Sequence, residues 1–130
     1  MPNASYERPR GWLHKFQHAF RGMVFGMHGH SSFAIHLPCA VLVVVIAGWL
    51  QVSRFEWCIL LLCIFGVLTA ELFNSALESV AKATDTQHNP HLGAALDIAS
   101  AAVLTSALGA ALVAMLILGP HLWAYLRLIF

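Results

Sequence analysis

Long apolar segments with few charges are the feature that most restricts how this chain can fold. A helix of about 20 apolar residues is long enough to cross the hydrocarbon core of a bilayer. The chain has 130 residues, of which 59% are hydrophobic and only 10% are charged, and its mean hydropathy is +0.74. This composition is typical of a membrane protein. A chain of this length holds about three spans and no separate soluble catalytic domain, so its chemistry must take place at the membrane surface.

The N-terminal part of the chain is more polar than the rest and divides into two segments. Residues 1–10 contain two prolines and several polar side chains, and we expect them to be disordered. In residues 11–27, apolar side chains recur at steps of three and four with basic side chains between them. This pattern predicts an amphipathic helix on the membrane surface. We expect residues 11–130 to form a single membrane domain.

Three transmembrane helices are predicted after the surface helix, which makes the fold class all-α integral membrane. Asn89 and Pro90 are placed to begin the last helix, and Gly119 with Pro120 is expected to end it. Small residues at four-residue steps around Ser106 favour close approach of another helix, within a compact bundle or an oligomer. The predicted spans are about 33–52, 55–84 and 92–118.

Basic residues concentrate near the N-terminus, where four of the seven lysines and arginines fall within the first 21 positions. This cluster predicts a cytoplasmic N-terminus. The segment is long and amphipathic and precedes no short apolar core, so it is not interpreted as a cleavable signal peptide. Its few charges adjoin membrane segments, which argues against nucleic-acid binding. The three cysteines lie in apolar runs without CxxC spacing and are interpreted as small hydrophobic residues.

A polar stripe interrupts the second apolar run in AELFNSALESVAKATD, residues 70–85. Glu71, Asn74 and Glu78 are spaced three and then four residues apart, so they share one narrow face of a helix that advances about 100° per residue. If the span begins near residue 55, Glu71 and Asn74 lie near the cytoplasmic boundary of the hydrocarbon core. A carboxylate at that depth costs on the order of a few kcal/mol unless it faces protein, water or a cation.

Two interpretations of the stripe are open. In the first, Glu78 pairs with Lys82 on a solvated helix end while Glu71 extends to the interface. In the second, the stripe is a site for a membrane-embedded substrate, where carboxylates hold a divalent cation on phosphates and another takes the proton of an attacking hydroxyl. The sequence contains no P-loop, HExxH or serine-elbow motif. The residues expected to approach the stripe from the other spans are Asp97, His30 and His36.

Four separated segments carry motifs that are specific in their order and spacing. They are FQHAFRG (16–22), VSRFEW (52–57), ELFNSALE (71–78) and ALDIASAAVL (95–104). Together they resemble the small prokaryotic diacylglycerol kinase family, which includes the undecaprenol kinases. ELFNSALE is similar to the family signature ExxNxAxE, and FQHAFRG is similar to its FxxAFRG surface-helix segment. The resemblance extends over about residues 16–118.

The resemblance implies a homotrimer of three-span subunits in the bacterial inner membrane, with active sites shared between subunits on the cytoplasmic side. The implied activity is transfer of the γ-phosphate of ATP to a lipid alcohol, diacylglycerol or undecaprenol, with Mg²⁺ or another divalent cation as cofactor. Glu71 matches the family's catalytic base, Asn74 its partner in the site, and Glu78 a magnesium ligand. The positions that match nucleotide contacts are Gln87, His88, Asn89 and Asp97.

Three positions depart from the family pattern, each by loss of a charge near the phosphates. His30 stands where the family has a second metal-binding glutamate, and Ala34 and Leu96 stand where basic residues are usual. Histidine is a poorer magnesium ligand than a carboxylate. Either His30, His36 or His88 now supplies contacts in the site, with a different divalent metal as an option, or the protein keeps the fold and has lost efficient kinase activity. In the second case it would bind lipid, nucleotide or a transition metal through its histidine-rich rim.

Overall fold

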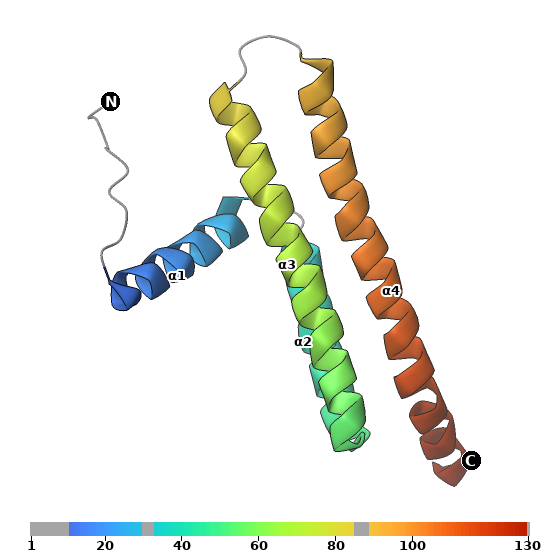
Figure 1. The fold of residues 1–130 in the computed structure, drawn as a ribbon. Helices are drawn as coiled ribbons and strands as arrows, with labels where there is room; N and C mark the ends of the chain where they lie inside the picture. The colour runs from blue at the N-terminus through green and yellow to red at the C-terminus, as the bar shows by residue number, and fades with distance from the viewer. Residues whose placement is uncertain (1–10, 30–32, 85–88, 130) are drawn as a thin grey trace.

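The structure, a computed structural model, describes residues 11–29, 33–84 and 89–129. These residues form four α-helices and no strand (Figure 1), so the all-α prediction is confirmed. The expected disorder of residues 1–10 concerns a segment outside the described residues. The helices are α1 (Trp12–Gly29), α2 (Phe33–Trp49), α3 (Arg54–Thr84) and α4 (Pro90–Ile129).

Helix α3 organises the fold because it packs against each of the other three helices, and α2 also packs against α4. The long axes of α2, α3 and α4 run alongside one another, while α1 lies crosswise to them (Figure 1). The α2–α3 turn and the end of α4 lie at one end of the bundle, here named the turn end. The end of α3 and the start of α4 lie at the opposite end, here named the loop end.

Two of these helices are long and apolar enough to cross a bilayer, namely α3 with 31 residues and α4 with 40 residues. Helix α2 is also apolar but has 17 residues. At about 1.5 Å per residue it is about 25 Å long, against a hydrocarbon core of about 30 Å. The described residues therefore contain two span-length helices and one shorter apolar helix, in the order expected for three spans.

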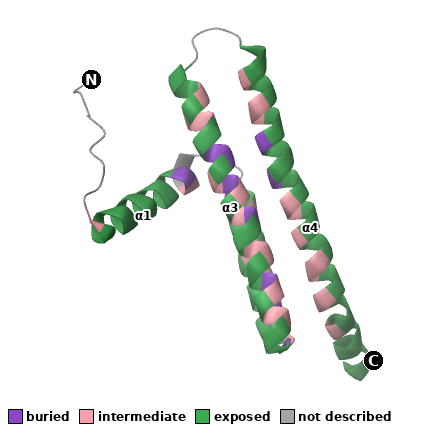
Figure 2. Cartoon of the chain, viewed as in Figure 1, coloured by how far each residue is buried: buried purple, intermediate pink, exposed green. Residues whose placement is uncertain are grey.

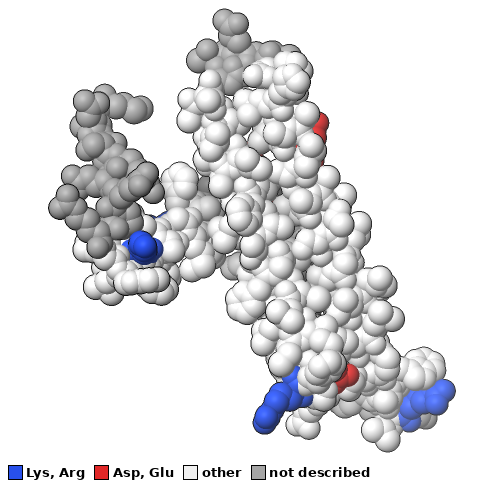
Figure 3. Space-filling model, viewed as in Figure 1, with Lys and Arg blue, Asp and Glu red and all other residues white. Residues whose placement is uncertain are grey.

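Most described residues of these helices are exposed in the single chain (Figure 2), and many of the exposed side chains are large and hydrophobic. Only 6% of the most apolar stretch of α4, and 28% of that of α3, is buried inside the chain. On the face shown in Figure 3, the charged atoms over α3 and α4 lie toward the two ends of the bundle, and others lie over α1. An apolar surface of this extent needs lipid or another protein surface to cover it.

The turn end carries aromatic and basic side chains of the kind found at membrane interfaces. The rings of Trp49 and Tyr125 meet edge to face with centroids 4.7 Å apart. The Arg127 guanidinium lies 5.1 Å from the centroid of the Trp123 ring. Such amphipathic rings favour the headgroup level, so the turn end has the chemistry of a membrane boundary.

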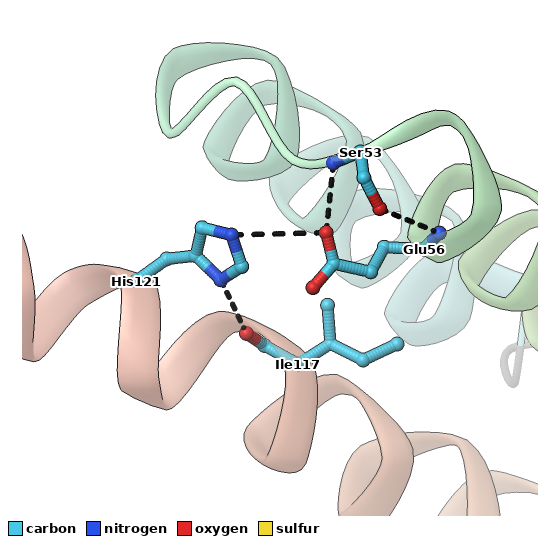
Figure 4. Close-up of polar contacts among 4 residues, drawn as sticks. All are labelled: Ser53, Glu56, Ile117 and His121. Carbon is cyan, nitrogen blue, oxygen red and sulfur yellow. Dashed lines mark hydrogen bonds and ion pairs between the residues drawn. The ribbon is translucent and has the colours of Figure 1, made fainter.

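The α2–α3 turn is set by local hydrogen bonds. Gln51 adopts a left-handed backbone conformation with φ of 52°, and the Val52 N–H donates to the Ala47 carbonyl at 3.3 Å. This is a Schellman ending for α2. Ser53 and Glu56 then form a capping box for α3, in which the Ser53 N–H donates to Glu56 Oε2 at 2.7 Å and the Glu56 N–H donates to Ser53 Oγ at 3.3 Å (Figure 4).

Helix α4 is longer than predicted. It continues through Gly119 and Pro120 to Ile129, so the prediction that these two residues end the helix is wrong. An interior proline removes one backbone donor and crowds the preceding turn, which costs about 3 kcal/mol. The extra turns also make contacts outside α4.

These contacts join the extra turns of α4 to the start of α3. The His121 ring places Nδ1 2.9 Å from the Ile117 carbonyl oxygen and Nε2 3.7 Å from Glu56 Oε2 (Figure 4). The contact between Trp49 and Tyr125 joins the same turns to the end of α2. Beyond Gly119 and Pro120 the helix thus contacts both α2 and α3.

Candidate active site

Glu71 is fully buried, at 0% exposure, in the interior of α3. Its Oε1 lies 3.0 Å from Nε2 of His36 on α2, which is an ion-pair contact between two helices. A buried carboxylate is expensive unless a partner compensates for the lost water. The burial contradicts the interpretation in which Glu71 extends to the interface, and the contact with His36 gives the carboxylate a partner inside the bundle.

Asn74 and Glu78 continue this polar face toward the loop end, as their spacing predicted. Asn74 Nδ2 donates to Glu78 Oε1 at 3.0 Å, and Asn74 itself is 6% exposed. Asn74 Oδ1 and Ser75 Oγ are buried and have no hydrogen-bond partner among the described residues. A buried polar atom left in this state costs about 1–3 kcal/mol. These two atoms are therefore suited to receive groups of a ligand.

An apolar cavity of about 300 Å³ lies between α2, α3 and α4, with His36 on its wall beside Glu71. It extends from His36 toward Leu60 and Ala114, which lie nearer the turn end. Apart from His36 and two cysteines, the described residues that line it are aliphatic. The α4 side is lined by alanines, whose small side chains leave this space open. A hydrocarbon chain would fit such a lining, with any polar group at the His36 end.

Helix α1 reaches the site through a close contact at Gly26, which is buried against α3. A Cβ atom at this position would lie 3.0 Å from Leu72 Cδ2 and 4.0 Å from Ser75 Cβ. The absence of a side chain therefore lets α1 pack closely against Leu72 and Ser75, the residues that follow Glu71 and Asn74 in α3. Gly26 was not predicted to take part, and the sequence signal was a small residue near the end of an amphipathic helix.

The other predicted site residues have different surroundings. Asp97 is exposed near the start of α4 and is not part of the buried group. Asn89 Oδ1 accepts from the N–H groups of His91 at 3.0 Å and Leu92 at 3.4 Å, so its side chain caps α4, and the predicted helix start is confirmed. The predicted residues that lie outside the described part of the chain are His30, Gln87 and His88.

A metal site made by the protein alone is not present in the described part of the chain. No group of three or more histidine, cysteine, aspartate or glutamate side chains there is placed to hold an ion. Among the described residues, carboxylates that could bind an ion occur singly, and that of Glu78 accepts a hydrogen bond from Asn74. Such an arrangement suits an ion that brings other ligands with it, because Mg²⁺ is usually bound by one or two carboxylates together with substrate phosphates.

Comparison with known proteins connects this geometry to a family. Residues 17–118 match the family model described as prokaryotic diacylglycerol kinase. The chain belongs to the prokaryotic diacylglycerol kinase family. The match begins within α1 and ends within α4, so it includes Glu71 and its neighbours, while the last turns of α4 lie beyond it.

Individual proteins similar to this diacylglycerol kinase family member carry the names of the same family. The undecaprenol kinase of Bacillus subtilis is 32% identical over 107 residues, which cover 82% of this chain and 87% of that protein. The diacylglycerol kinase of Escherichia coli K12 is 28% identical over 104 residues, which cover 80% and 85%. The diacylglycerol kinase of Synechocystis is 33% identical over 111 residues, which cover 85% and 63%.

Family membership assigns an enzyme class. The chain is a membrane lipid kinase, a phosphotransferase with an alcohol group as acceptor. The resemblance drawn from the four sequence motifs is thereby confirmed. The comparisons favour the kinase over a non-catalytic protein of the same architecture.

Proposed function

We propose that this lipid kinase transfers the γ-phosphate of ATP to the hydroxyl of a membrane lipid alcohol, diacylglycerol or undecaprenol. The observation that carries the proposal is the contact of the buried Glu71 carboxylate with His36, a residue that lines an apolar cavity between α2, α3 and α4. A base in this position would meet a hydroxyl whose hydrocarbon chain remains in apolar surroundings. The names of the relatives support both lipids as acceptors.

The proposed topology places α1 on the cytoplasmic surface of the bacterial inner membrane and α2, α3 and α4 across it. Lys15 and Arg21 give α1 its positive charge, and exposed rings such as Phe16 supply an apolar side for the bilayer. Because Gly26 contacts α3 at Leu72 and Ser75, the membrane surface under α1 would cross α3 at the level of the site. The loop end would then be cytoplasmic, where ATP is available.

A homotrimer is part of the same proposal. Its support is the large apolar surface of α3 and α4 that remains exposed in one subunit, together with the resemblance to the trimeric family. Neighbouring subunits would cover part of this surface and lipid the remainder. The active sites would lie between subunits at the loop end.

The proposed chemistry is direct phosphoryl transfer with Glu71 as general base. Glu71 takes the proton of the lipid hydroxyl while the hydroxyl oxygen forms a bond to the γ-phosphorus of ATP. The bond between this phosphorus and its bridging oxygen breaks, and ADP leaves with the electron pair. The proton on Glu71 then passes to water. Asn74 would act beside the base by orienting Glu78 and by binding a reactant through Oδ1.

The phosphates and the metal would be held at the loop end. Glu78 would bind Mg²⁺ or another divalent cation, with His30 as a second ligand, and Asp97 would lie near the nucleotide. Gln87, His88 and Asn89 would contact ATP. When bound, the cation would offset the negative charge on the phosphates. The single carboxylate of Glu78, oriented by Asn74, fits an ion whose remaining ligands are phosphate oxygens and water.

Transfer of labelled γ-phosphate in mixed micelles tests this function. The purified protein would receive ATP, diacylglycerol or undecaprenol, and magnesium, manganese or zinc. We expect Glu71→Gln and Glu78→Gln to lower kcat by about 100-fold or more, because general-base catalysis and charge neutralisation are each worth about that much. Glu56→Gln is the matched control, since it makes the same change in the same helix at the turn end.

The two outcomes separate the candidate functions. Transfer that depends on Glu71 and Glu78 but not on Glu56 would establish the kinase, its lipid and its metal. No transfer to either lipid with any of the metals, by protein shown to be folded, would contradict the proposal. It would favour the non-catalytic interpretation.

A further inference from the structure

His36 contributes to this site from a different helix and was assigned no role in the proposed chemistry. Its Nε2 lies 3.0 Å from Glu71 Oε1, and the two side chains are 23% and 1% exposed. We propose that His36 is a positioning residue, which holds the Glu71 carboxylate in the direction needed to accept the proton of the lipid hydroxyl. This inference rests on the proposed function, in which Glu71 is the base.

The contact brings together two polar side chains from different helices. Glu71 Oε1 lies 3.0 Å from His36 Nε2, and the carboxylate is buried while the ring is partly exposed. A carboxylate oxygen accepts hydrogen bonds, and a histidine ring nitrogen that carries a hydrogen donates them. The ring is therefore placed where it can limit the direction of the Glu71 carboxylate.

The position of the pair explains why a second helix is needed. Glu71 is on α3, and its side chain has rotatable bonds that would let the carboxylate point in several directions. A contact to α2 limits this rotation by tying the carboxylate to a separate rigid element. Misplacement of a catalytic group by about 1 Å can cost about 100-fold in rate. Control of this direction is the role we assign to His36.

The cavity supplies an independent reason to place His36 beside the reacting hydroxyl. The His36 side chain lines the apolar cavity between α2, α3 and α4, and the same side chain contacts Glu71. A lipid chain in the cavity would bring its hydroxyl toward this polar end. The ring of His36 thus lies where the lipid and the base meet, and it is placed to position both.

The chain offers a matched control for this pair. His121 and Glu56 form a second histidine–glutamate contact at the turn end, with Nε2 and Oε2 3.7 Å apart and side-chain exposures of 33% and 24%. This pair also joins two helices, α4 and α3. It lies at the turn end, away from Glu71, and neither of its side chains lines the cavity, so His121→Leu should not change the chemical step.

Steady-state kinetics of His36→Leu and His36→Gln test the role. Leucine removes the donor, whereas glutamine carries an N–H donor at a similar reach. We expect kcat to fall by about 10- to 100-fold in His36→Leu with the KM for ATP unchanged, and most of the loss to be recovered in His36→Gln. A kcat that stays at the wild-type value in His36→Leu, while Glu71→Gln is inactive, would overturn the inference and leave the proposed function standing.

Nitrogen NMR of protein labelled at histidine tests the contact without activity. We expect the His36 ring nitrogens to shift between the wild type and Glu71→Gln, while those of His121 remain in place. An unchanged His36 signal would overturn the inference even if no lipid is phosphorylated. If His36→Leu does not fold, this comparison and the His36→Gln kinetics decide the question.

Discussion

Replacement of Glu71 by leucine should separate catalysis from stability. If Glu71 serves the reaction and not the fold, Glu71→Leu will abolish phosphoryl transfer and will also make the protein more stable. The reason is the burial of its carboxylate among apolar helices, at 0% exposure. A residue selected for structure at this position would be apolar.

The size of the effect follows from the surroundings of the two partners. Replacement of buried ion pairs by apolar side chains of similar volume has been neutral or stabilising by about 1–4 kcal/mol. Here the His36 side chain is 23% exposed, so removal of the Glu71 carboxylate does not leave its ring fully buried without a partner. We therefore expect Glu71→Leu to raise the free energy of unfolding by about 1–3 kcal/mol.

Leu60 provides the comparison, because it is the other large side chain that is almost completely buried among the described residues, and it also lies on α3. Leu60→Ala should lower the free energy of unfolding by about 2–5 kcal/mol, the usual cost of such a cavity. The two variants are thus expected to change stability in opposite directions.

Reversible unfolding in mixed micelles by increasing denaturing detergent, followed by far-UV circular dichroism, measures both variants. Lipid kinase activity is measured on the same samples. A Glu71→Leu protein that is as destabilised as Leu60→Ala would refute the reasoning. It would show that the contact between Glu71 and His36 is a structural requirement of the bundle.

Three further predictions concern the turn and the approach of α1. The free energy of unfolding should be about 0.5–1 kcal/mol higher for Gln51→Gly than for Gln51→Ala, because glycine adopts the left-handed conformation without a Cβ clash. Detergent unfolding of the two variants measures this difference. Equal unfolding midpoints would contradict it. Ser53→Ala should lower the same free energy by about 1 kcal/mol through loss of the capping box, with unchanged kinase activity as the check that the turn end is remote from the site. Gly26→Val should push against Leu72 and destabilise by about 1–3 kcal/mol, with a raised KM for the lipid. Gly22→Val is its control because nothing lies within 4 Å of a Cβ there, and equal effects of the two would argue against the close contact.

Several local features were predictable from the sequence because they depend on neighbouring residues. The spacing of Asn74 and Glu78 places them one helical turn apart, and the structure joins them by a hydrogen bond. Asn89 before Pro90 begins α4 because a side-chain oxygen can cap the first turn. The capping box of Ser53 and Glu56 follows the SxxE pattern, which depends only on residues three apart in the sequence.

The continuation of α4 shows where local preference was insufficient. Gly119 and Pro120 are residues that commonly follow a helix, and the sequence pattern therefore predicted an end. The helix instead continues, and it brings His121 into contact with Glu56. This contact lies between residues distant in the chain, so no local pattern could reveal it.

The sequence by itself determined the all-α class, the apolar helices, the polar face of α3 and the family, because these depend on composition, period and motif order. Only the tertiary structure decided that Glu71 is fully buried, that His36 is its partner and that a cavity lies beside them. It also decided that α1 packs closely against α3 at Gly26. The physical reason is that burial and contact depend on which faces of α1, α2, α3 and α4 meet, and this is a property of their packing.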